Sequence, residues 1–221
     1  MKVKLIPIIE LGYNNQGIKP PTAYPYSNNQ EIWFEYRNAS LQKADFKDEF
    51  EPYLKGSPFY EPAKITNRNL EKIVVDNTEE FINGIYGRDQ VCCFFGGFVL
   101  KVNGADKFFP QCCGDLSDLM YWEKISQGQH AAYEGHPAPV YKFSSNQVIL
   151  DFTVGEYDEH FIPTPPDTKL EINLEDLNLA VTNAKITLNK LAERVIKINQ
   201  KLNLGIESID DLLIWGDGNR N

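Results

Sequence analysis

The sequence lacks a long apolar run and is poor in histidine and in positive charge. No run approaches the roughly 20 apolar residues that cross a bilayer, so we expect no membrane-spanning segment. Lysine and arginine together number 22 against 31 aspartate and glutamate residues, which gives a net charge of −9. Because binding to a phosphate backbone needs clustered positive charge, this balance argues against a nucleic-acid partner. An acidic surface is better suited to a basic protein partner.

The first ten residues begin with lysines and continue with apolar residues, as secretory signals do. Pro7 interrupts the apolar stretch, Glu10 ends it, and no small-residue cleavage site follows. We therefore interpret this stretch as a first strand, and we expect a cytoplasmic protein of bacterial type. A chain of 221 residues can bury a core without disulfides. No cofactor-binding signature is present, so no cofactor is predicted.

The most regular pattern in the chain predicts one long helix over about residues 174–203. Asn173 is suited to cap its start, and Gly205 is suited to end it. Leu179 and Ile186 lie opposite the main apolar stripe, and the flanking positions lack the acidic partners of a coiled coil. We expect the helix to pack inside its own chain with both residues covered; a structural homodimer remains the alternative. The main stripe comprises Leu174, Leu177, Val181, Ala184, Leu188, Leu191, Val195, Ile198 and Leu202.

Two antiparallel hairpins are predicted upstream of this helix, at about residues 91–113 and 140–154. Asn103-Gly104 between apolar arms is a strong signal for the first, because both residues tolerate positive φ. Alternating apolar residues mark the return arm of the second. The fold class is therefore α+β. We expect one domain over residues 1–221, with a weak subdivision near the prolines of residues 163–167.

Two vicinal cysteine pairs, Cys92-Cys93 and Cys112-Cys113, fall on opposite arms of the first predicted hairpin. A structural zinc ion would need four thiolates in a tetrahedral array. Adjacent residues in a strand point to opposite faces, so four such sulfurs would split into two pairs. Small buried hydrophobic residues are the simpler interpretation, with a zinc site as the alternative.

Cys113 also precedes Asp115 at a predicted helix N-terminus, where the macrodipole favours a thiolate. The charges of Asp115 and Asp118 oppose this effect. A thiol- or metal-dependent hydrolase centred on Cys112 and Cys113 is therefore an alternative function. His136 is the candidate base, although nothing in the spacing brings a histidine close to either thiol. We lean towards a protein that is not an enzyme.

The stretch Pro110-Gln111-Cys112-Cys113-Gly114-Asp115-Leu116, followed by Trp122, resembles a segment of uncharacterised bacterial cytosolic proteins. Some of those proteins are similar to the immunity proteins of bacterial toxin systems. The resemblance implies a protein that binds and blocks a cognate toxin and has no chemistry of its own. A basic toxin would suit the acidic chain. The residues that we expect at the binding surface are Asp115, Asp118, Trp122, Asp158 and Glu159.

Overall fold

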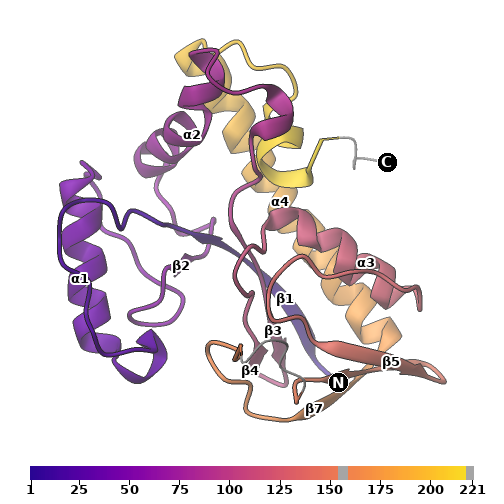
Figure 1. Ribbon diagram of the computed structural model, residues 1–221. Helices are drawn as coiled ribbons and strands as arrows, with labels where there is room; N and C mark the ends of the chain where they lie inside the picture. The colour runs from indigo at the N-terminus through magenta and orange to yellow at the C-terminus, as the bar shows by residue number, and fades with distance from the viewer. Residues whose placement is uncertain (154–158, 218–221) are drawn as a thin grey trace. The chain divides into compact units, whose positions relative to one another are not determined.

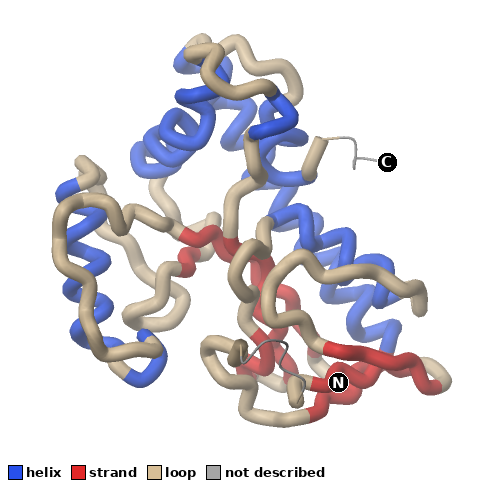
Figure 2. The backbone as a smooth tube through the Cα atoms, viewed as in Figure 1, coloured by secondary structure: helices blue, strands red, loops and turns tan. Residues whose placement is uncertain are grey.

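The computed structural model describes residues 1–153 and 159–217. The chain divides into two compact units, each built from two stretches of sequence. Unit 1 comprises residues 1–7 and 96–188, and unit 2 comprises residues 8–95 and 189–221. Helices and strands occur together, as the predicted α+β class requires (Figure 2). The boundaries follow Pro7, Phe95 and Leu188, so none coincides with the subdivision expected near residues 163–167.

The first predicted hairpin is present in unit 1 but is shorter than expected. Strand β3 spans Gly96–Val102 and β4 spans Ala105–Phe108, and Asn103 and Gly104 between them have φ values of +51° and +88°. The predicted arms reached residues 91 and 113. The first arm begins at Gly96 and not at residue 91. Gly96 and Gly97 have φ of +131° and +124°, a backbone conformation that glycine adopts readily and that departs from a regular strand. Pro110, which has no N–H to donate to a ladder, follows the end of the second. All four cysteines therefore lie outside the strands, contrary to the prediction.

The second hairpin is confirmed and belongs to a three-stranded antiparallel sheet. Strand β5 (Val140–Ser144) pairs with β6 (Gln147–Asp151), and β6 pairs with β7 (Lys169–Asn173). Strand β7 was not predicted from the sequence. It has only two buried residues, Leu170 and Ile172, and they come directly after a proline-rich stretch. The strand leads directly into the long helix, which is why Asn173 can cap it.

Helix α4 spans Leu174–Leu202 and confirms the predicted long helix (Figure 1). Asn173 Oδ1 accepts hydrogen bonds from the N–H groups of Glu175 (2.9 Å) and Asp176 (3.3 Å), as a capping residue does. The helix ends ahead of the predicted Gly205, because Asn203 already takes the left-handed conformation with φ of +51°. The buried stripe comprises Leu177, Ala180, Val181, Ala184, Leu188, Leu191, Ala192, Val195 and Ile198.

The stripe confirms that α4 packs within its own chain, but the expectation for its outer face is wrong. Leu179 is 61% exposed and Ile186 is 51% exposed. Within unit 1, η3 (Leu116–Asp118) leads into α3 (Leu119–Ser126), and Lys185 Nζ of α4 reaches Glu123 Oε1 of α3 at 2.6 Å. This ion pair joins α4 to α3.

Unit 2 contains η1 (Tyr26–Asn28), α1 (Gln30–Lys43), α2 (Asn67–Ile82), η2 (Arg88–Gln90) and η4 (Asp211–Trp215). The Thr66 side chain caps the start of α2, and Asn77 Nδ2 donates to Ile73 O at 2.8 Å within the helix. Arg194 of α4 donates to Pro62 O and Ile65 O at 2.7 and 2.6 Å, which attaches the start of α2 to α4.

Strand β1 (Val3–Glu10) confirms the first predicted strand and runs through the boundary after Pro7. Its last two residues pair with β2 (Phe59–Tyr60) in unit 2, and the order of hydrogen-bonded strands in this sheet is β2-β1-β3-β4. None of the helices in the described ranges combines the length and the apolar character that a bilayer crossing demands.

Candidate functional site

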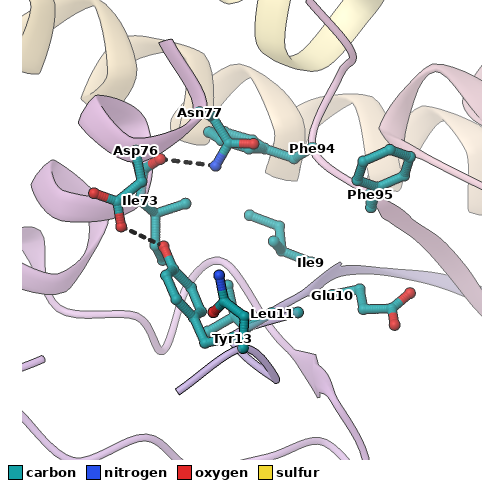
Figure 3. Close-up of a pocket in the computed structure, with 11 residues that line it drawn as sticks. Ile9, Glu10, Leu11, Tyr13, Ile73, Asp76, Asn77, Phe94 and Phe95 are labelled. Carbon is teal, nitrogen blue, oxygen red and sulfur yellow. Dashed lines mark hydrogen bonds between the residues drawn. The ribbon is translucent and has the colours of Figure 1, made fainter. Parts of the chain in front are cut away.

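A hollow of about 270 Å³ opens in unit 2 next to the end of β1, and we call it the Tyr13 hollow. Three stretches that are far apart in sequence form it. Figure 3 shows Tyr13 and Asp76 facing one another at one end, with Phe95 and Glu10 at the other. The lining residues are Ile9, Glu10, Leu11, Gly12, Tyr13, Asn15, Ile73, Asp76, Asn77, Phe94 and Phe95.

Main-chain hydrogen bonds within unit 2 hold two of these stretches in place. Glu10 N donates to Phe95 O at 2.7 Å, which places residues 94–95 beside the end of β1. Leu11 N donates to Pro58 O at 2.9 Å, and Phe94 N donates to Leu213 O at 2.8 Å. Backbone groups therefore fix residues 10–11 and 94–95 within unit 2, so these two walls of the hollow are preorganised.

The polar end of the hollow is a fixed network. The Tyr13 hydroxyl donates to Asp76 Oδ2 at 2.6 Å, and Lys72 Nζ, one helical turn earlier on α2, lies 3.0 Å from the same oxygen. Burial raises the pKa of Tyr13 and the bonded Asp76 carboxylate raises it further, so the phenol stays protonated and donates. The Tyr13 ring also packs edge-on against Phe46, at 4.8 Å between centroids. This end therefore presents a rigid polar rim.

Glu10 at the other end is partly buried, and burial raises the pKa of its carboxyl group. The guanidinium of Arg37 opposes that increase. Arg37 is held in turn by a 3.0 Å hydrogen bond from Nε to Gly56 O and by the ring of Trp33, 5.3 Å away. The negative charges of the hollow thus each have a cation nearby, Lys72 for Asp76 and Arg37 for Glu10.

The floor of the hollow is apolar and its edge carries an exposed aromatic ring. Ile9, Ile73 and Phe94 are each 1% exposed, whereas Phe95 is 46% exposed. Neighbouring residues of an extended chain point to opposite sides, which explains why one phenylalanine enters the core and the next faces out. An exposed ring beside a buried apolar floor is well suited to receive an apolar side chain from another molecule.

The binding residues predicted from the sequence lie elsewhere, in unit 1. Asp115 Oδ1 accepts from Ser117 N and Ser117 Oγ at 2.7 and 2.6 Å, so it caps η3. Asp118 is 4% exposed and accepts from Asp115 N at 3.3 Å; burial and the charge of Asp115 raise its pKa to about 7. Trp122 is 1% exposed and packs against Phe108 in the core. Asp118 and Trp122 are thus buried, and only Asp115 of these three is partly accessible.

Glu159 is exposed, and Asp158 lies outside the described residues. Among residues 1–153 and 159–217, no three side chains of His, Cys, Asp or Glu gather closely enough to hold a metal ion. The four-cysteine arrangement is therefore not observed: Cys93 is buried with Sγ 3.5 Å from Leu212 O, and Cys112 and Cys113 are exposed. The structure does bring His136 to Cys112, through a main-chain bridge in which His136 N donates to Cys112 O at 2.9 Å.

The chain matches no protein-family model, no curated protein and no solved structure. The Tyr13 hollow is not predictable from the sequence, because no local spacing joins residues 9–15, 73–77 and 94–95. One feature of the sequence could have indicated an exposed aromatic residue here. Phe94 and Phe95 are adjacent, and in an extended backbone adjacent side chains point to opposite sides, so one of the two rings must face away from the core.

Proposed function

We propose that the protein is a non-enzymatic binding module that engages another protein through the Tyr13 hollow. The observation that carries this proposal is Phe95, which keeps 46% of its surface exposed beside a floor of fully buried apolar residues. Binding energy at protein interfaces concentrates in a few such anchors, where an aromatic ring meets a preformed pocket. A polar rim around an apolar centre, as Tyr13, Asp76 and Asn77 supply here, has the same layout as an interface.

The size of the hollow suits an inserted side chain. Pockets for small molecules usually enclose roughly 300–1,000 Å³. The Tyr13 hollow, at about 270 Å³, lies at the lower edge of that range. One or two side chains of a partner would fill it, and the rest of the contact would lie on the surrounding surface.

The chemistry of the lining residues also supports binding over catalysis at this site. None of the described lining residues is a cysteine, serine, threonine, histidine or lysine, so a nucleophile in the hollow would have to be Tyr13 or a carboxylate. Its two carboxylates belong to Glu10 and Asp76, and the second is already engaged by Tyr13 and Lys72. A general acid or base needs a proton position open to a substrate. These groups are better described as the rim of a contact surface.

The kind of partner follows from charge and from the resemblance at Pro110–Leu116. A net charge of −9 attracts basic proteins over a distance and speeds their encounter. Because the carboxylates of the hollow are compensated locally, the hollow itself supplies the apolar anchor. We therefore propose that the partner is a basic protein, most concretely a toxin that this immunity-type protein neutralises.

The test first establishes whether a toxin-like open reading frame lies immediately upstream of the gene and then measures binding of its product by titration calorimetry. We expect a one-to-one complex and survival of a bacterial host that expresses both proteins. Phe95→Ala should weaken the complex about 30-fold, which corresponds to the roughly 2 kcal/mol of an interface hot spot.

Ile32→Ala is the matched control, because Ile32 also belongs to unit 2, is 49% exposed and does not line the hollow. This variant should bind as the parent does. Equal affinities of parent and Phe95→Ala would move the contact away from the hollow. The absence of any complex with that gene product would reject the toxin-neutralising function itself.

A further inference from the structure

Cys112 and Cys113 occupy the centre of a tight turn in unit 1. Gly114 N donates to Gln111 O at 3.1 Å, which closes a four-residue turn with the two cysteines at its central positions. Cys113 has φ of +71°, a conformation that glycine or asparagine usually takes and that costs other residues roughly 1–3 kcal/mol. Both cysteines are exposed, and their Sγ atoms lie 3.5 Å apart.

The turn is held by hydrogen bonds on every side. Cys112 O accepts from His136 N at 2.9 Å, and Gly114 O accepts from Gly96 N at 2.9 Å. The buried side chain of Gln111 both donates to Ile162 O (3.3 Å) and accepts from Ile162 N (2.9 Å). The backbone beneath the two thiols is therefore fixed, while the thiols themselves face outward. A strained residue that so many bonds hold in place points to a role for that residue.

The distance between the sulfur atoms distinguishes two uses of such a pair. Two thiolates bound to one tetrahedral centre at about 2.3 Å each lie roughly 3.8 Å apart, which is near the observed 3.5 Å. A disulfide needs about 2.05 Å between sulfurs and usually has about 4.4–6.8 Å between Cα atoms. Adjacent Cα atoms are only about 3.8 Å apart. The geometry therefore suits the joint binding of one atom better than a bond between the sulfurs.

We propose that Cys112 and Cys113 form a two-thiolate site for a thiophilic centre, either trivalent arsenic or a soft metal ion. Thiolates select such centres over the hard ions that prefer oxygen. With a trivalent arsenical the reaction is a condensation. Two As–S bonds form, both S–H bonds break, and the arsenic-bound oxygen leaves as water with the two protons. Arsenic stays trivalent, so the step needs no oxidant or reductant.

The chain carries an internal control for this site, because Cys92-Cys93 is also a vicinal pair. Cys92 is exposed, but Cys93 is 6% exposed and its Sγ lies 3.5 Å from Leu212 O in the core of unit 2. Both pairs consist of adjacent residues, but only in Cys112-Cys113 are both thiols accessible. A reagent that needs two accessible thiols should therefore discriminate between them.

The experiment exposes the reduced protein to phenylarsine oxide and measures intact mass. We expect one adduct, with a mass gain of one phenylarsenic group less two hydrogen atoms, which persists in excess 2-mercaptoethanol and is removed by dithiothreitol. Cys112→Ser and Cys113→Ser should each lower the fraction of adduct that survives the monothiol at least about 100-fold, because the second sulfur acts at high effective concentration. Cys92→Ser should leave it unchanged.

A parallel titration with zinc alone, followed by native mass spectrometry, identifies the source of the bound centre. Adduct formation without zinc binding assigns the site to arsenic, and binding of both assigns it to soft centres in general. Loss of the adduct in Cys92→Ser, its survival in Cys112→Ser, or failure of both probes to bind would overturn the proposal. None of these readouts depends on the Tyr13 hollow or on a protein partner.

Discussion

Replacing Asp118 by asparagine should change how the stability of the protein depends on pH. Asp118 is 4% exposed, and its carboxyl lies beside the partly exposed Asp115. Burial, with a further contribution from Asp115, raises its pKa from an ordinary 3.8 to about 7, although N–H groups of Asp115 and Glu134 oppose the increase. The charge of Glu134 also contributes to the raised pKa of Asp118. Tyr121 and Tyr133, which interact with Asp118 as well, have pKa values raised by burial and stay neutral throughout this range.

The direction of the effect follows from the protons that each state holds. Between about pH 4 and pH 7 the unfolded chain has lost the Asp118 proton and the folded chain keeps it. Unfolding therefore releases a proton, and the free energy of unfolding falls as the pH rises across this window. Each tenfold change in proton affinity is worth about 1.4 kcal/mol, so the full window corresponds to roughly 4 kcal/mol.

Asp118→Asn removes the titrating group but keeps an oxygen that can accept from Asp115 N. We expect the free energy of unfolding of the variant, relative to the parent, to increase by up to about 4 kcal/mol from pH 4 to pH 8. Urea denaturation of both proteins at matched pH values measures this difference. Asp89→Asn, a substitution of an exposed aspartate, should show no such trend. A difference between Asp118→Asn and parent that stays constant with pH would refute the reasoning.

Three further substitutions, two of them paired with a control substitution, test the packing and the cap of α4 by chemical denaturation. Gly114→Ala should cost about 1–3 kcal/mol, because its new Cβ would lie 3.0 Å from both Asp118 Oδ2 and Gly96 O; Gly12→Ala, whose added Cβ would have no other atom within 4 Å, should be almost neutral in stability. Leu188→Ala should cost about 2–5 kcal/mol, whereas Leu179→Ala on the same helix should stay within about 0.5 kcal/mol, since these residues are 0% and 61% exposed. Asn173→Ala should cost about 1 kcal/mol through loss of the α4 cap; a stable variant would show that the cap adds nothing.

The elements that the sequence predicted correctly are those whose signal is local and periodic. Helix α4 repeats its apolar residues over eight turns, and the turn at Asn103-Gly104 requires a backbone that few other pairs adopt. Where one residue type serves two purposes, the sequence alone does not distinguish them. Asn77 resembles a capping residue, yet its side chain bonds to Ile73 O within α2, as asparagine can also do.

The candidate site was harder to predict because it depends on tertiary contacts. Phe95 meets the end of β1 through one backbone hydrogen bond across 85 positions of sequence, and no spacing rule reports such a meeting. Trp122 was predicted at the binding surface but lies in the core. Its indole ring and its acidic neighbours are compatible with a surface anchor, and only the packing against Phe108 places it in the core. Aromatic residues carry this ambiguity because they are favoured in both settings.

The three chain boundaries, after Pro7, Phe95 and Leu188, mean that neither unit is one continuous stretch of polypeptide. A single crossover between related genes therefore yields no fragment that contains one complete unit and nothing of the other. The same holds for a single proteolytic cut followed by separation of the pieces. In a protein whose units follow one another along the chain, one crossover can exchange a whole unit; here it cannot.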